Sequence, residues 1–401
     1  HAYPHIACPN PKIDYVRESV RWWDKWLKGI ENNIMDEPKL QYYLMDSVKP
    51  AVDYEHREGS WQSAVAWPPA SMRHRQYFLH PGSLLTEPND KPHTLEVNSP
   101  ETTGRMGGKL MVGIGFSGEF PNDQQADDRQ SRTFDTPVLG EILDIVGQPR
   151  VNLALCSDQP VSNVIVRLCD VHPAGESTLV TYGVLNLAHR ESNENPEALV
   201  PGQTYRVDIA LNHIAYRLPR GHRLRLAVSN AYWPLIWPSP FKDRLYLELS
   251  ECRLSLPCPA SVIENTNPAL SDHDPDKLPA SLELRPGHTR KTTREDPETG
   301  ELKIRTETDY GYHWHRSCDT GVDFTINQLL SIHPDEPNSA KSEATLRVKM
   351  QQGDTETALR SHYKMTSSSQ HYFIRATWQA WEGENCIFEQ QFNEKIERNL
   401  I

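Results

Sequence analysis

The spacing of apolar residues near the start of the chain predicts an amphipathic helix. Apolar side chains recur three and four positions apart and share one helical face; they are Ile13, Val16, Val20, Trp23 and Leu27. Asn10 can cap this helix, Pro11 suits its first position, and Gly29 is typical of the residue just after the end. A stripe this apolar is unfavourable in water. We therefore expect a larger domain before residue 1 to cover it.

After this helix the pattern changes to the period of β-strands. Extended segments are predicted at KLQYYLMDS (39–47) and at RQYFLHPGSLL (75–85), and short alternating or β-branched runs separated by turn residues follow from about residue 150. These runs are RVNLALCSD (150–158), NVIVRLCDVHPAG (163–175), STLVTYGVLNL (177–187), TYRVDIALN (204–212), HRLRLAVSN (222–230) and RLYLELS (244–250). They are typical of an antiparallel sandwich or jelly roll. Alternation should place Val151, Leu153 and Leu155 on one face.

The remainder of the chain predicts a second β domain. A polar, proline-rich stretch at 257–280 has the composition of a linker. Further strand-like runs lie beyond it, at ELKIRTETDYGYHWH (301–315), at 342–368 and at 370–392. We therefore expect a mainly β protein in which the linker separates two β domains.

Charge and composition exclude some partners. The 401 residues carry a formal net charge of -12 and no compensating run of Lys and Arg, which argues against nucleic acid as a partner. No apolar run approaches the roughly 18 residues of a membrane span, so we expect a soluble protein. The seven cysteines are scattered without a C-x-x-C pair. This usage favours reduced thiols and a cytoplasmic location.

The sequence contains partial matches to cofactor and metal motifs, but the residues around each match do not fit the motif. The run GIGFSG (113–118) matches G-x-G-x-x-G, but Pro121 follows where a helix should open, so no dinucleotide site is expected. Ser117 is followed directly by Gly118 and therefore misses the G-x-S-x-G nucleophile elbow. His313 and His315 would share a strand face, yet no third ligand has a suitable spacing. No cofactor or metal is expected.

A tryptophan pair and one aspartate are interpreted as structural residues. Trp233 and Trp237 lie among prolines and could form a platform for carbohydrate or an apolar substrate, but packing against a neighbouring domain is favoured. Asp170 precedes a turn that contains Gly175, and we interpret it as a hairpin residue without a catalytic role.

Several segments in order resemble one enzyme family. They are HAYPH (1–5), RWWDKWLKG (21–29), DEPKLQYYLMDS (36–47), LCDVHPAGEST (168–178) and PGQTYRVDIALNHIAYRLPRGHRLRLAVSNAYWP (201–234). This arrangement is similar to the CocE/NonD hydrolases, the cocaine-esterase and X-Pro dipeptidyl-peptidase family of serine hydrolases. The resemblance covers 1–256, and 280–401 is similar to an extra C-terminal β region of longer members.

The resemblance implies a place for the first histidine. In the family, an α/β-hydrolase domain carries the nucleophilic Ser and the Asp, and the triad His stands just before a helix with the D-x-W-L-K-G pattern, here 24–29. His1 occupies that place, and we favour it over His5 as the base. The Ser, the Asp and the oxyanion hole would then lie upstream, so this chain alone would be an incomplete enzyme.

The resemblance also implies domain limits. Residues 1–70 would end the α/β-hydrolase domain, 71–256 would form a jelly roll with a galactose-binding-like sandwich, 257–280 a linker and 281–401 a C-terminal β domain. The expected substrate is a small ester, amide or peptide, the expected partner is the upstream catalytic domain, and a homo-oligomer stays open. An alternative from another class is a non-catalytic β-sandwich module that binds carbohydrate or a protein.

Overall fold

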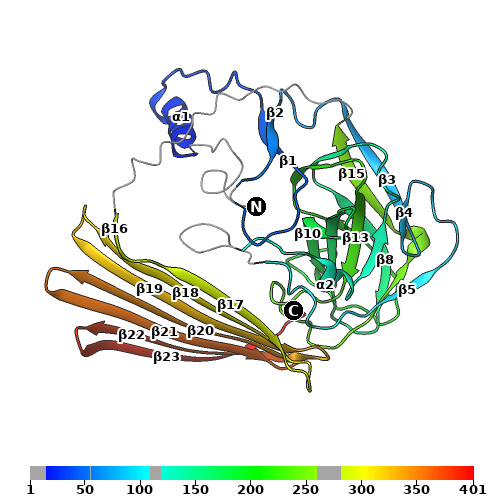
Figure 1. Cartoon of the computed structure of the whole chain (residues 1–401). Helices are drawn as coiled ribbons and strands as arrows, with labels where there is room; N and C mark the ends of the chain where they lie inside the picture. Colours follow the sequence, from blue (N-terminus) through cyan, green and yellow to red (C-terminus); the bar gives the residue numbers. More distant parts are fainter. Residues whose placement is uncertain (1–14, 55, 109–118, 260–280) are drawn as a thin grey trace.

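A computed structural model describes residues 15–54, 56–108, 119–259 and 281–401. In these ranges the chain is mainly β, as predicted, and its strands form three sheets of four, eleven and eight strands. The first two sheets share one core and are called the N-terminal β unit below. The eight-stranded sheet, called the C-terminal sheet, is a separate curved layer (Figure 1).

Helix α1 spans Tyr15–Lys28 and confirms the predicted helix over its described length. Gly29 follows with a φ of +69°, a left-handed conformation that ends helices at low cost for glycine. The amide of Ile30 then donates to the carbonyl of Asp24 and closes the last turn. The proposed cap at Asn10 and first position at Pro11 lie outside the described residues.

The four-stranded sheet combines strands from distant parts of the chain. Its order is β2-β1-β12-β7, with β1 at Leu40–Asp46, β2 at Gly59–Ala64, β7 at Leu143–Gly147 and β12 at Ile214–Leu218. Strand β1 pairs in parallel with β12, with Met45 opposite Tyr216. This sheet therefore contains strands from both sides of residue 70, where the sequence predicts a domain boundary.

The eleven-stranded sheet has the order β10-β9-β13-β6-β4-β3-β15-β8-β14-β5, and β11 also pairs with β8. Its strands are β3 (Met72–His80), β4 (Ser83–Leu85), β5 (Thr94–Val97), β6 (Arg132–Asp135), β8 (Arg150–Ser157), β9 (Asn163–Val171), β10 (Ser177–Asn186), β11 (Tyr205–Ala210), β13 (Arg223–Ser229), β14 (Leu245–Glu248) and β15 (Arg253–Pro259). Short helical turns lie at α2 (Gln125–Asp128), η1 (Leu187–His189) and η2 (Leu249–Glu251).

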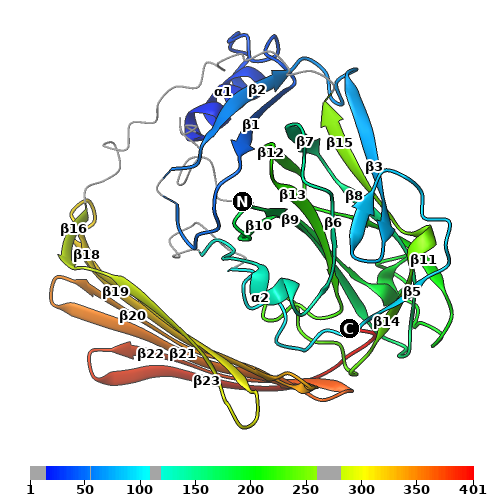
Figure 2. The same ribbon diagram turned by 45° about the vertical axis from the view of Figure 1, so that its right-hand side comes forward.

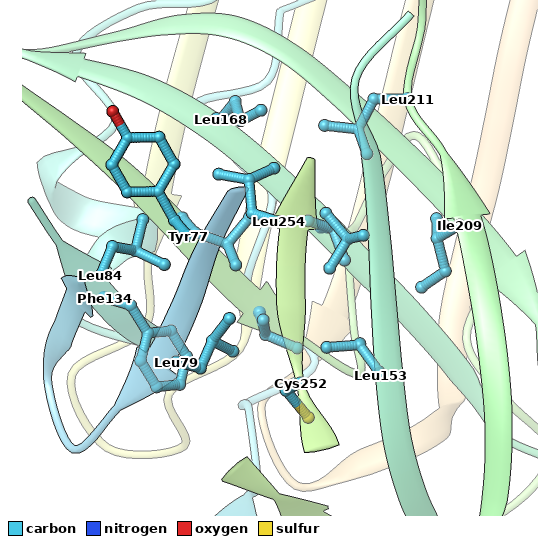
Figure 3. Close-up of a cluster of buried hydrophobic side chains, with 14 of the residues drawn as sticks. Tyr77, Leu79, Leu84, Phe134, Leu153, Leu168, Ile209, Leu211, Cys252 and Leu254 are labelled. Carbon is cyan, nitrogen blue, oxygen red and sulfur yellow. The ribbon is translucent and has the colours of Figure 1, made fainter. Parts of the chain in front are cut away.

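The apolar core is built mainly by the eleven-stranded sheet, and Leu143, Ile145, Ile214, Tyr216 and Leu218 of the four-stranded sheet join it. Figure 3 shows part of it, including Leu153 of β8 and Leu254 of β15. Val151, Leu153 and Leu155 are each at most 1% exposed, which confirms that they share one buried face. Strand β8 is antiparallel to β11, β14 and β15, as expected for an antiparallel fold. The jelly-roll connectivity itself stays a prediction.

The C-terminal sheet is a meander of long strands. Its order is β16-β18-β19-β20-β21-β22-β23, and β17 also pairs with β18. The strands are β16 (Ser281–Arg285), β17 (His288–Glu295), β18 (Leu302–His315), β19 (Thr320–His333), β20 (Glu336–Gln352), β21 (Thr355–Ser367), β22 (His371–Glu382) and β23 (Asn385–Glu397). The runs predicted beyond residue 300 fall on β18, on the hairpin of β20 and β21, and on the hairpin of β22 and β23, whereas β19 was not predicted.

None of the helices in the described ranges has the length and apolarity to cross a membrane. The six described cysteines are free thiols, and three of them, Cys169, Cys252 and Cys258, are buried.

Candidate functional site

The predicted base cannot be placed by the structure. His1, the competing His5 and the glycine-rich run 113–118 all lie outside the described residues. His313 and His315 are both on β18 and half-buried, and the Nε2 atom of His313 lies 2.9 Å from the carbonyl oxygen of Tyr310.

A buried group of polar side chains surrounds Asp170, near the end of β9. Asp170 is fully buried, and its carboxylate accepts three hydrogen bonds. Ser47 donates to Oδ2 over 2.5 Å, Tyr216 donates to the same oxygen over 2.9 Å, and Nδ1 of His222 donates to Oδ1 over 2.7 Å. Such charge-assisted bonds offset the cost of burying the carboxylate. The Asp170 cluster, as we call these residues with His172 and Thr178, is therefore a satisfied polar network.

Two histidines complete the cluster on one side. The rings of His172 and His222 have centroids 4.7 Å apart, and Nε2 of His172 lies 2.9 Å from Oγ1 of Thr178. Burial lowers the pKa of His172, since the charged imidazolium is poorly solvated there. The neighbouring His222 adds to this lowering, whereas Asp170 opposes it.

The cluster and its neighbours form hydrogen bonds and an ion pair between the segment after β1 and the β9–β10 hairpin. Besides the bond from Ser47, the hydroxyl of Thr178 donates to the carbonyl of Val48 over 2.8 Å. Lys49 forms an ion pair with Glu176 of the hairpin turn over 2.5 Å. Because α1 precedes β1 in the chain, the cluster fixes the place where the segment that begins with α1 joins the N-terminal β unit.

The hairpin interpretation of Asp170 is therefore only part of its role. Gly175 does form the turn, with a φ of +104° and an amide that donates to the carbonyl of His172. The three donors to Asp170, however, come from positions 46 to 123 residues away in the chain. No pattern in the sequence predicted these donors. The available signal was a charged residue inside a strand whose residues are otherwise mostly apolar.

The chemistry of the cluster can be compared with known kinds of site. Asp170, His172 and His222 offer ligand atoms within 4.8 Å of one another, a group that could hold a metal ion. Nε2 of His172, Nδ1 of His222 and Oδ1 of Asp170 are already hydrogen-bonded within the protein, so a metal bound by these atoms would have to displace those bonds. An Asp–His pair also orients the base of a catalytic triad, but the Ser47 hydroxyl donates to the carboxylate and not to an imidazole. The arrangement favours a structural role.

Trp233 and Trp237 pack against the C-terminal sheet, as predicted. Trp233 is 2% exposed and lies in one cluster with Leu302, Ile304 and Ile332. Nε1 of Trp237 donates to the hydroxyl of Ser367 over 3.0 Å, and its ring lies edge-on to Tyr372. Trp233 is thus too buried to serve as a carbohydrate platform, and Trp237 contacts the C-terminal sheet.

Two buried acids lie beside this junction. Burial raises the pKa of Glu101 to about 8, and the nearby Asp243 adds to the rise. Burial also raises the pKa of Asp243 to about 7, although Ser162 and Asn230 donate to its carboxylate. The amide of Glu101 donates to the carbonyl of Pro334 in the C-terminal sheet region over 2.9 Å. A change in their charge would therefore act at the contact between the two β units.

Comparison with known proteins identifies the N-terminal β unit. Residues 32–275 match the family model of the X-Pro dipeptidyl-peptidase C-terminal non-catalytic domain. A protein of Mycobacterium bovis named as a serine esterase is 27% identical over 249 residues, covering 57% of this chain and 38% of that protein. A protein of Bacillus anthracis named as an Xaa-Pro dipeptidyl-peptidase is 24% identical over 247 residues, covering 61% and 37%.

The cocaine esterase of Rhodococcus sp. (strain MB1 Bresler) is 22% identical over 243 residues, covering 57% of this chain and 40% of the esterase. The chain thus spans less than half the length of these relatives. The matched family region ends at residue 275, before the first strand of the C-terminal sheet.

Proposed function

Because the chain belongs to the CocE/NonD and X-Pro dipeptidyl-peptidase family and carries its C-terminal non-catalytic domain, we propose that it is the C-terminal part of a serine hydrolase. The observation that carries this proposal is the family match over residues 32–275. The reaction would be hydrolysis of an ester or amide bond through an acyl-enzyme. Candidate substrates are small acyl esters and peptides with proline in the second position.

In this proposal the nucleophilic Ser, the Asp and the oxyanion hole belong to an α/β-hydrolase domain upstream of residue 1. His1 would supply the general base, which takes the serine proton and returns it to the leaving group. His5 is the competing assignment. No cofactor or metal is needed for this chemistry.

The exposed face of α1 supports a domain upstream. Among the described residues nothing covers its apolar stripe: Val16 is 53% exposed, Trp23 54% and Leu27 75%. A large apolar patch of this kind marks a protein contact. We assign it to the catalytic domain, and the Asp170 cluster would hold this segment in place.

The test uses the full polypeptide, including the sequence upstream of residue 1. We expect hydrolysis of p-nitrophenyl acetate or of an X-Pro-p-nitroanilide, and the relative rates would distinguish an esterase from a peptidase. His1→Ala should lower kcat by several orders of magnitude with an unchanged circular dichroism spectrum, since loss of one triad member disables the set. The matched control His5→Ala should cost far less.

The opposite result for the two variants would move the base to His5 and leave the family role intact. A folded full polypeptide without hydrolysis of either substrate, and without a G-x-S-x-G segment upstream, would contradict the proposal. The alternative of a binding module for carbohydrate or protein would then stand.

A further inference from the structure

The strand register of the C-terminal sheet sorts its side chains onto two very different faces. Residues directly opposite each other in neighbouring strands share a face. Leu346 is paired with Ile326 on one side and Ser361 on the other, and Ser361 is paired with Trp378. Following this register by steps of two gives the apolar face, which includes Val322, Phe324, Ile326, Leu346, Val348, Met350, Leu359, Tyr363, Met365, Ile374, Trp378, Phe388 and Phe392.

In β19, β20 and β21, charged side chains separate the two faces of the sheet. Across residues 320–367, all of them described, the apolar face of β19, β20 and β21 carries no charged side chain. The opposite face of β20 and β21 carries Lys341, Glu343, Arg347, Lys349, Arg360 and Lys364. A strand that alternates in this way has one face for water and one for a protein contact.

One end of the apolar face is already such a contact. Leu302, Ile304 and Ile332 lie on it and pack against Trp233 of the N-terminal β unit. Ser367 and Tyr372, which are paired across β21 and β22, contact Trp237. The same face continues without interruption along the strands, away from this junction.

The other end of the apolar face has no cover among the described residues. Met350 is 39% exposed, Leu359 47%, Trp378 51% and Phe388 48%. In both views of the molecule, this end of the sheet and helix α1 project to the same side of the N-terminal β unit (Figures 1 and 2). The apolar stripe of α1 and the free end of the apolar face thus both lie exposed on one side of the molecule.

We propose that the free end of the apolar face is a second docking surface for the catalytic domain, which also contacts α1. This inference rests on the proposed function. A single body on that side can cover both surfaces, and the face continues an interface that the protein already makes with its own N-terminal β unit. The C-terminal sheet, which lies beyond the matched family region, would then wrap around the enzyme and hold an apolar, uncharged surface of the catalytic domain.

Hydroxyl-radical footprinting of the full polypeptide tests this assignment with a matched pair of phenylalanines. Phe388 lies on the apolar face and Phe373 on the opposite face, and Phe388 is the more exposed of the two here, 48% against 36%. If the catalytic domain covers the apolar face, Phe388 should be oxidised several-fold more slowly than Phe373. Trp378 should be protected together with Phe388.

A pair of variants gives a second readout. Leu359→Asp places a charge on the apolar face, whereas Phe373→Asp places the same charge on the opposite face. The half-life of hydrolase activity at elevated temperature should fall several-fold for Leu359→Asp and stay close to wild type for Phe373→Asp.

Each result supports or overturns the inference. Equal oxidation of Phe388 and Phe373 in an active enzyme would overturn it and leave the proposed function standing. Protection of Phe388 that appears only at concentrations where the protein dimerises would assign the face to a second copy and also overturn it. A full polypeptide without hydrolase activity would remove the proposed function, and with it this inference.

Discussion

Nδ1 of His222 lies 2.7 Å from Oδ1 of Asp170, and this contact joins the turn before β13 to the end of β9. The carboxylate also accepts from Ser47 after β1 and from Tyr216 in β12. One buried charge thus connects four segments that are far apart in the chain. The stability of the N-terminal β unit should depend strongly on it.

Asp170→Asn keeps the shape of the side chain and removes its charge. We expect the free energy of unfolding to fall by roughly 2–4 kcal/mol. Hydrogen bonds to a charged group are worth about 1.5–3 kcal/mol each, and the NH2 group of the new Asn would be a donor placed opposite another donor. Chemical denaturation measures the change. The control is Asp208→Asn, whose exposed ion pair with Arg150 should be worth at most about 1 kcal/mol. Equal losses in the two variants would contradict the role of Asp170.

The lowered pKa of His172 gives the stability a pH dependence on the acid side. The unfolded chain takes up a proton near the ordinary pKa of 6.5, whereas the folded protein resists it because the imidazole is buried. The free energy of unfolding should therefore fall as the pH drops below about 6.5. Chemical denaturation between pH 5 and pH 8 measures this dependence. The free energy of unfolding should change less steeply with pH in His172→Gln than in the wild type. His288→Gln, at an exposed position, is the control, and an unchanged slope for His172→Gln would refute the assignment.

Glu101 makes the stability depend on pH in the opposite direction, because its pKa is raised to about 8. Above pH 4.5 the unfolded carboxyl loses its proton while the folded one keeps it, so this group lowers the stability as the pH rises towards 8. Glu101→Gln removes the titration. We expect the variant to be more stable than the wild type by about 3 kcal/mol at pH 7, since each pKa unit corresponds to about 1.4 kcal/mol.

Comparing Glu101→Gln with the exposed control Glu87→Gln, by denaturation at pH 5 and pH 8, checks this expectation. The difference between the variant and the wild type should grow between the two pH values only at position 101. A constant difference would mean that Glu101 is charged in the folded protein.

Local pattern predicted helix α1 and many of the strands, but it missed β2, β7, β12 and β19. Alternation placed the β8 run and the buried side chains of Val151 and Leu153 correctly, because each side-chain direction depends only on the residue's own strand. The packing of Trp233 and Trp237 was also predicted, from their place among prolines in a loop.

Pairing between distant strands could not be predicted in the same way. The parallel contact of β1 with β12 joins Met45 to Tyr216, and no periodicity in either segment specifies the other. The Asp170 cluster depends on this contact, since Ser47 reaches the carboxylate from just after β1 and Tyr216 from the middle of β12. Sequence alone therefore found Asp170 without finding its partners.

The connectivity of the two β units also sets an order of assembly. In the C-terminal sheet, strands β18 to β23 each pair with the next strand along the chain, so its contacts are local and should form quickly. In the eleven-stranded sheet, β15 pairs with β3, and Leu254 meets Tyr77 only after a long loop has closed. During synthesis the sheet that emerges last is thus the faster folder. The end of its apolar face that packs against Trp233 would stay exposed, and prone to aggregation, until the slower N-terminal β unit is complete.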